Sequence, residues 1–256
     1  IIYINMNIVE KINNTRYTLK KILNDEWDTS SIAELSNSEV EKMYTTQSGK
    51  LPSLSLFGVA SGCNFTVKHK FIPSHSLHVI YYNFPEIGRL NSKVTKSACD
   101  KLNKLYEGDL IKKEDSLIVI VNDTISESLE NSFNDYNISL QSQLDEQELS
   151  PEIIDEMKKN NYPLKKSHFR NVHLFDINNL TNNLLEHRLV PQHKSIRKIE
   201  DINKILEKCN CSLNQLPIIL KNDMVSKLIR LSPGDICEIK RKSSKCGEYP
   251  FYRVCK

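Results

Sequence analysis

The feature that most constrains the fold is residues 117–121, five consecutive apolar residues with the sequence LIVIV. Successive side chains of a strand point to opposite faces, so a strand made of this run is apolar on both faces. Such a strand needs helices on both sides of its sheet, as in α/β layer structures. The run therefore predicts a strand in the middle of a covered sheet. Apolar residues at Val94, Ala98, Leu102 and Leu105 have helical spacing and predict one covering helix.

Both helices and strands are predicted in the rest of the N-terminal part. Helical periodicity predicts a helix over residues 8–23, and Ser36 with Glu39 is a capping-box signature for a shorter second helix. A break is predicted at residues 27–30. Further strands are predicted at 54–57, 77–84 and 172–176. We therefore expect an N-terminal α/β domain over residues 6–178. The first methionine is Met6, and residues 1–5 are assigned no fold.

A polar, charged segment at 140–166 is predicted to be a surface excursion, with a helix beginning at Pro151. The pattern changes again over residues 178–189, and the stretch RLVPQH at 188–193 marks a domain boundary, so a second domain is predicted over 179–256. Its predicted elements are a helix over 196–209 with Ser195 as N-cap, a short helix capped by Asp223, a turn at 233–235, and a hairpin. The hairpin strands are 236–240 and 249–255, with 242–247 as a polar connector. These elements predict a small α+β domain.

Composition excludes several classes of protein. The chain has 256 residues, of which 39% are hydrophobic and 26% charged, as in soluble globular proteins rather than disordered or collagen-like chains. No apolar run approaches the roughly 18 residues of a membrane span, and no signal peptide is recognised, so an intracellular protein is expected. The seven cysteines are scattered without zinc spacing, which favours reduced thiols, and no metal or cofactor is expected.

Enzyme signatures are not found in the sequence. Only seven glycines are present, and no phosphate-binding loop, nucleophile elbow or zinc-protease motif appears. A divergent nuclease would need converging carboxylates and a lysine at a metal. The nearest acids, Glu86 and Asp123, lack such a partner and are interpreted as solvated carboxylates at strand ends. No catalytic residue is therefore assigned.

Charge is distributed unevenly along the chain. Residues 186–256 contain 15 lysines and arginines against 8 acidic residues, whereas the first 185 residues contain 20 against 24. A basic region can be a nucleic-acid footprint or a surface for a protein partner. No pattern of interleaved aromatic residues accompanies these charges, so a protein partner is favoured.

The C-terminal residues resemble a known family. A pattern of Q-L-P, an Asp, G-[DE]-V-x-x-I-x-R-x-S and G-x-Y-x-x-Y-R-x-C characterises the C-terminal domain of the shared RNA polymerase subunit 5, which has an archaeal counterpart. This chain meets it with Gln215, Leu216, Pro217, Asp223, Gly234, Asp235, Ile239, Arg241, Ser243, Gly247, Tyr249, Tyr252, Arg253 and Cys255. Upstream, the family's H-x-L-V-P-x-H is met by His187, Leu189, Val190, Pro191 and His193.

This resemblance implies a non-catalytic subunit of a multisubunit DNA-directed RNA polymerase. It implies a C-terminal assembly domain that docks on the largest subunit, and an N-terminal domain with a restriction-endonuclease-like α/β fold that forms part of the lower jaw near downstream DNA. The implied partner-interface residues are His187, Leu189, Val190, Pro191, His193, Arg241, Ser243, Gly247, Tyr249, Tyr252 and Arg253. The alternatives are a stand-alone nucleic-acid-binding protein and a divergent nuclease.

Individual residues in this set also have simpler interpretations. His187 and His193 could be core histidines with satisfied hydrogen bonds, which is favoured over metal binding. Arg241 and Arg253 could be exposed strand charges, although the planar guanidinium suits partner contacts. In the N-terminal domain, a family loop of sequence T-P-S-A lies near the downstream duplex. Here residues 122–127 take its place with Thr124 and Ser126, so any contact with DNA is expected to be weak and non-specific.

The sequence departs from the family pattern at several points. Met224 follows Asp223 where the family has Pro, Arg230 stands where Gly is usual, and Gln192 replaces Lys. Residue usage is also biased, with 27 Ile and 25 Asn against 3 Ala, as expected from AT-rich codons. Together these features favour a large DNA virus, with the protein in the virion and host cytoplasm, over a cellular nucleus.

Overall fold

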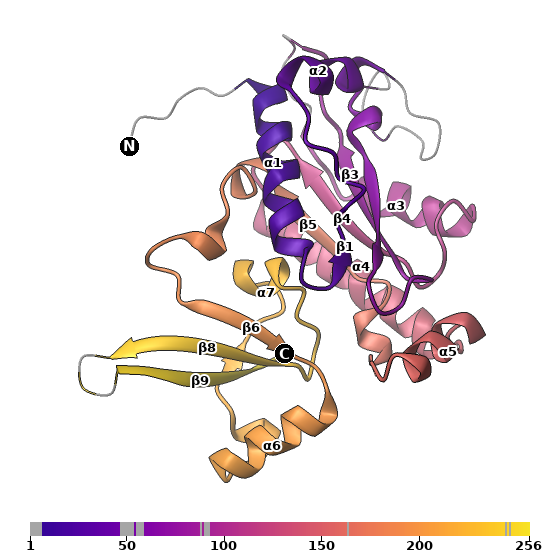
Figure 1. Ribbon diagram of the computed structural model, residues 1–256. Helices are drawn as coiled ribbons and strands as arrows, with labels where there is room; N and C mark the ends of the chain where they lie inside the picture. Colours follow the sequence, from indigo (N-terminus) through magenta and orange to yellow (C-terminus); the bar gives the residue numbers. More distant parts are fainter. Residues whose placement is uncertain are drawn as a thin grey trace. The chain divides into compact units, whose positions relative to one another are not determined.

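The computed structural model describes residues 7–46, 54, 59–87, 89, 93–162, 164–243, 245 and 247–256. The chain divides into two compact units (Figure 1). Unit 1 holds the residues up to 156 together with 169–182, and unit 2 holds 157–168 together with 183–256. Each unit combines one β-sheet with helices, so the predicted mixture of α and β structure in two parts is confirmed.

Unit 1 is built on a five-stranded sheet of order β1-β2-β3-β4-β5. The first two pairings are antiparallel, and the β3–β4 and β4–β5 pairings are parallel. The elements are α1 (Ile8–Leu23), β1 (Trp27–Asp28), α2 (Asn37–Thr45), η2 (Ser61–Cys63), β2 (Phe65–His69), β3 (Ser76–Tyr82), α3 (Ser97–Glu107), β4 (Ser116–Val121), α4 (Glu127–Asp145), α5 (Pro151–Lys159), β5 (Val172–Asp176) and η4 (Ile177–Asn179). The last three residues of α5 fall in unit 2.

Strand β4 contains the LIVIV run, and its environment agrees with the prediction. It lies between β3 and β5, and all six of its residues are buried. One face of the sheet packs on α3 and α4 through side chains such as Leu102, Leu105 and Phe133. Helix α1 lies over the opposite face (Figure 1). A strand apolar on both faces is therefore covered on both faces.

Local signals explain where several helices begin. Ser36 and Glu39 form the predicted capping box of α2, and α5 begins at Pro151 as predicted. Helix α4 is not among the predicted elements. Its N-cap is Ser126, whose hydroxyl accepts a hydrogen bond from the Leu129 N–H at 3.3 Å. Its exposed face carries mostly polar residues, which obscures the apolar stripe in the sequence.

Three other expectations in unit 1 are modified. A break is expected at residues 27–30, but Trp27–Asp28 form the edge strand β1, which pairs with the unpredicted β2. The predicted strand at 54–57 lies outside the described residues except for Leu54, which is in no strand. The segment 140–166 is more structured than a surface excursion, because it contains the end of α4 and all of α5, with Leu140, Leu144 and Ile153 buried.

Unit 2 contains a four-stranded sheet of order β6-β8-β9-β7. Its elements are η3 (Lys166–His168), η5 (Leu184–Glu186), β6 (Gln192–Ile196), α6 (Ile199–Cys209), η6 (Leu213–Gln215), β7 (Ile218–Ile219), α7 (Met224–Leu228), β8 (Ile236–Ser243) and β9 (Gly247–Cys255). One face of the sheet packs against α6, with Ile202, Ile205 and Val254 in the cluster. The other face packs against Ile229 and Leu231 at the end of α7.

Two predicted elements of unit 2 need correction. Ser195 is not the N-cap of α6, because Ser195 and Ile196 belong to β6 and the helix begins at Ile199 after Lys198. The hairpin is longer than predicted, since the strands extend to Ser243 and begin at Gly247. The short helix capped by Asp223 is confirmed: the Asp223 carboxylate accepts the Val225 N–H at 2.9 Å.

A buried ion network ties the segment 157–168 to the sheet of unit 2. Asp235, with no exposed surface, accepts hydrogen bonds from His168 Nε2 at 2.9 Å and from the Ser232 N–H at 3.0 Å. The Nε group of Arg197 lies 3.4 Å from the same carboxylate. Arg197 also donates to two backbone carbonyls at the end of α7. Burying a carboxylate is costly unless cations and donors surround it, and this network supplies both.

Candidate partner-binding surface

Residue alternation in unit 2 places many of the predicted interface residues on one side of the sheet. The β8–β9 register sets Arg241 opposite Tyr249 and Ile239 opposite Phe251, and β6 sets His193 beside Ile239. Residues directly opposite each other share a face. We call the following set the basic–aromatic face: His193, Arg241, Tyr249, Phe251 and Arg253. This face is on the same side of the sheet as the buried cluster that contains Leu231, Cys237 and Ile239.

The aromatic ring of Phe251 makes cation–π contacts with both arginines of this face. The guanidinium carbon of Arg241 lies 4.1 Å from the ring centroid, and that of Arg253 lies 5.5 Å away. Arg253 also donates to the carbonyl of Ile218 at 2.8 Å. Cation–π contacts of this kind hold a guanidinium in place without removing its charge. The face therefore presents ordered cations next to aromatic surface.

Tyr252 lies on the other face of the sheet. It is opposite Glu238 in the register and packs beside the cluster under α6. Burial raises the pKa of its phenol, and the neighbouring Glu238 carboxylate raises it further. The resemblance predicts Tyr252 and Arg253 as members of one interface, and the structure separates them onto opposite faces.

Ser243 and Gly247 shape the end of the hairpin. They are opposite each other in the register, and the Ser243 hydroxyl accepts the Lys245 N–H at 3.2 Å. Gly247 has a φ of 69°, in the left-handed region that glycine adopts without a steric cost. Among the predicted interface residues, these two therefore have a direct role in turn geometry.

The two histidines of the H-x-L-V-P-x-H motif fix a loop by local hydrogen bonds. His187 Nδ1 accepts the Leu189 N–H at 3.2 Å, while His193 Nδ1 donates to the carbonyl of Pro191 at 2.6 Å. The Val190 N–H also reaches the His187 carbonyl at 2.9 Å. His187 is exposed, so the core interpretation is wrong for it, although its structural role through a hydrogen bond agrees with the expectation. These contacts present Leu189 to solvent with 76% of its surface exposed.

His193 is only partly buried, and its surroundings favour the neutral imidazole. Burial lowers its pKa below the ordinary value of 6.5, and the hydrogen bond to Pro191 opposes this effect. Arg241 and Arg253 on the same face also lower the pKa, while Asp223 raises it. A neutral His193 is consistent with its role as an Nδ1–H donor to a carbonyl.

A groove of about 550 Å³ lies beside this loop. It is lined by Arg188, Leu189, Val190, Pro191, Gln192, Lys240, Arg241, Lys242 and Glu248. Lys242 and Glu248 form an exposed ion pair at 3.7 Å. The predicted interface residues Leu189, Val190, Pro191 and Arg241 therefore meet in one concave region. Arg188, Lys240 and Lys242 are not among the predicted residues, and only their place in the basic C-terminal region could have indicated them.

The two residues predicted to lie near DNA follow β4 in unit 1, and both are exposed. Ser126 caps α4, so its hydroxyl already has a structural partner. The N–H of Thr124 bonds to the Asp123 carboxylate at 2.8 Å. The side chain of Thr124 is thus the more accessible of the two for a ligand.

The acids considered for a nuclease have ordinary structural contacts. Glu86 pairs with Arg89 at 2.8 Å on the surface, and Asp123 accepts the N–H groups of Thr124 and Val94. Within the described ranges, no three His, Cys, Asp or Glu side chains are grouped so that they could hold a metal ion. Nor do these ranges contain a helix long and apolar enough to cross a bilayer.

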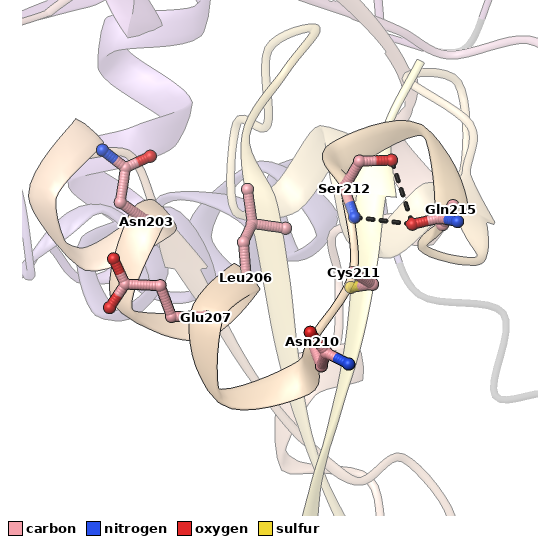
Figure 2. A pocket seen from close by; sticks show the side chains of 7 residues that line it. All are labelled: Asn203, Leu206, Glu207, Asn210, Cys211, Ser212 and Gln215. Carbon is pink, nitrogen blue, oxygen red and sulfur yellow. Dashed lines mark hydrogen bonds between the residues drawn. The ribbon is translucent and has the colours of Figure 1, made fainter.

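A second hollow, of about 450 Å³, lies at the C-terminal end of α6 (Figure 2). Two of its polar residues bond to each other: the backbone N–H and the hydroxyl of Ser212 both donate to Gln215 Oε1, at 2.7 and 3.1 Å. None of the predicted interface residues lines it. The groove beside Leu189 is therefore the better candidate for a binding site.

Comparison with known proteins matches this same region. The family described as RNA polymerase Rpb5, C-terminal domain, matches residues 182–255. A protein named DNA-directed RNA polymerase subunit Rpo5 from Methanosphaera stadtmanae is 44% identical over 71 residues, which are 28% of this chain and 91% of the relative. Proteins of the same name from Pyrococcus abyssi (43% over 72 residues, 28% and 87%) and Sulfurisphaera tokodaii (44% over 68 residues, 27% and 80%) are also similar.

Proposed function

The chain belongs to the RNA polymerase subunit 5 family, and from this premise we propose that it is a non-catalytic subunit of a multisubunit DNA-directed RNA polymerase. The observation that carries the proposal is the match over residues 182–255, which spans almost the whole length of the archaeal relatives. These residues form nearly all of unit 2, including its complete sheet. The matched region is thus a folded unit rather than an isolated motif.

Unit 2 is proposed to dock on the largest polymerase subunit. The basic–aromatic face and the groove beside Leu189 support this role, because both present ordered cations together with exposed apolar surface. Aromatic residues and arginine are enriched at the centres of protein interfaces. Tyr252, on the opposite face, is proposed to support the fold instead of contacting this partner.

Unit 1 is proposed to be the jaw domain, with a restriction-endonuclease-like fold and a place near downstream DNA. Apart from residue 182, it lies outside the residues that match the family. Its parallel inner strands, covered by helices on both faces, support the fold proposal. Exposed Thr124 at the end of β4 supports weak, sequence-independent contact with phosphate groups.

The origin and location of the protein are proposals that rest on composition. The relatives named above are archaeal, and each matches 27–28% of this chain. The Ile- and Asn-rich usage supports a large DNA virus, with the protein in the virion and the host cytoplasm. The polymerase assignment is independent of this choice, because it depends on the match to unit 2.

The basic character of residues 186–256 favours one alternative, a stand-alone nucleic-acid-binding protein. The two functions differ in what the purified chain does alone. A stand-alone binder would bind duplex DNA with an affinity that falls as salt is added. For each phosphate contact, the affinity would fall by about one logarithmic unit per tenfold rise in salt concentration. The proposed subunit should bind DNA weakly alone, and when tagged in its native cells it should copurify with the other polymerase subunits. Strong DNA binding without copurification would favour the alternative.

A further inference from the structure

We infer that the groove beside Leu189 receives an acidic segment of the partner polypeptide, with an apolar side chain of that segment seated against Leu189. This inference rests on the proposed function and names the chemistry of the partner. Three observations carry it: the charge balance of the groove, the exposed leucine, and the local rigidity of the loop that bears it.

The charge of the groove is unbalanced. Four cations line it, Arg188, Lys240, Arg241 and Lys242, against the single anion Glu248. Glu248 pairs with Lys242, and within the described part of the chain no ion pair is found for the other three. Carboxylates of a partner would complement these cations, and the same cations would repel a basic segment.

Leu189 adds exposed apolar surface to the same groove. Leu189 is the most exposed large hydrophobic residue of the described chain, and Val190 and Pro191 extend the apolar surface beside it. A nucleic acid would use the cations but would leave Leu189 in water. A polypeptide with both carboxylates and an aliphatic side chain uses both features, which favours protein over DNA as the occupant.

Local hydrogen bonds hold the loop in this structure. His187 and His193 each close a local hydrogen bond, and Pro191 restricts the backbone between them. Binding to a preformed loop loses less conformational entropy than binding to a mobile one. The H-x-L-V-P-x-H motif thereby acquires a physical role, which is to hold Leu189 outward next to the cations.

A crosslinking experiment tests the occupant directly. Leu189 is replaced by the photoreactive residue p-benzoylphenylalanine in the full chain, the chain is assembled into polymerase in cells, and crosslinked peptides are identified by mass spectrometry. The expected adduct is a segment of another polymerase subunit with several Asp or Glu residues within about five residues of the crosslink, a span of about 17 Å on each side. An adduct to a neutral or basic segment, or to nucleic acid, would overturn the inference.

Charge reversal gives an independent measurement. Arg188→Glu and Lys240→Glu should each weaken association with the partner subunit by about tenfold at low salt, and the loss should shrink as salt is added. Lys204→Glu on α6, also exposed but outside the groove, is the matched control and should have little effect. Equal effects of all three variants would contradict the inference.

Failure of this inference can be distinguished from failure of the proposed function. If the wild-type chain itself fails to assemble with polymerase, the proposed function fails. If it assembles and the three variants do not differ, only this inference fails.

Discussion

The guanidinium group of Arg241 stacks on the ring of Phe251, with 4.1 Å between the guanidinium carbon and the ring centroid. The two residues come from different strands of the hairpin and lie on the same face. Both residues are partly exposed, and a contact of this kind at exposed sites stabilises by about 0.5–1 kcal/mol. Its larger consequence is that the charge is positioned before a partner arrives, which reduces the ordering cost of association.

The separation of Arg253 and Tyr252 onto opposite faces gives the first prediction. Arg253→Ala should weaken assembly with the largest subunit by about 2 kcal/mol or more, because it removes an ordered cation from the docking face. Tyr252→Ala should leave the affinity nearly unchanged, apart from effects on stability. Pull-down titrations measure both affinities, and thermal unfolding of each variant separates binding from folding. A larger loss for Tyr252→Ala would place the interface on the other face.

The buried network around Asp235 gives the second prediction. Asp235→Ala should lower the free energy of unfolding by about 3 kcal/mol or more, since it leaves His168 and Arg197 without their common carboxylate. Asp201→Ala is the matched control, because Asp201 pairs with Lys204 on the exposed surface of α6 and should change stability by less than about 1 kcal/mol. Urea unfolding measures both. Equal losses would show that the network does not stabilise unit 2.

The lowered pKa of His193 gives a pH prediction. Burial disfavours the imidazolium, so the unfolded chain binds this proton more readily than the folded chain, and stability rises with pH where the two states differ. The contribution is fully present above the ordinary pKa of 6.5 and is lost as the pH falls through that value toward the lower folded pKa. His193→Asn can still donate to Pro191 but does not titrate. Its stability should therefore fall less between pH 7.5 and 5.5 than that of the wild type, and identical pH profiles would contradict the assignment.

Ser126 and Thr124 should differ in what their hydroxyls do. Ser126→Ala should lower the free energy of unfolding by about 1 kcal/mol through loss of the α4 N-cap. Thr124→Ala should leave stability nearly unchanged but weaken photocrosslinking to downstream DNA in assembled polymerase. If Thr124→Ala leaves crosslinking unchanged, the proposed place of this loop near DNA is wrong.

Elements with a local sequence signal could be predicted. The LIVIV run, the Ser36–Glu39 capping box and the Asp223 cap each depend on neighbours a few residues away, and all are present in the structure. Strand β6 has no clear sequence signal, because its sequence QHKSI is mostly polar and only partly buried, and it pairs with β8 residues 40 to 48 positions later. The His168–Asp235 contact joins residues 67 positions apart and leaves no local signature.

Some residues of the candidate surface could be predicted from the sequence, but its geometry could not. Which side chains share a face depends on the β8–β9 register, and this separates Tyr252 from Arg253 and adds Phe251 between the two arginines. At Arg230, by contrast, the family pattern does indicate the backbone geometry. Arg230 stands where the family usually has glycine, and its φ of 55° shows the left-handed backbone that explains that preference.

The central claim is that unit 2 makes this chain a stoichiometric polymerase subunit. The most direct measurement is quantitative mass spectrometry of complexes purified through a tag on the full chain in its native cells, after size-exclusion chromatography. We expect the chain to elute with the two largest polymerase subunits at equal molar amounts, and we expect Arg253→Ala to reduce the fraction of the chain that does so. Elution of the wild-type chain by itself, with no polymerase subunit present, would contradict it.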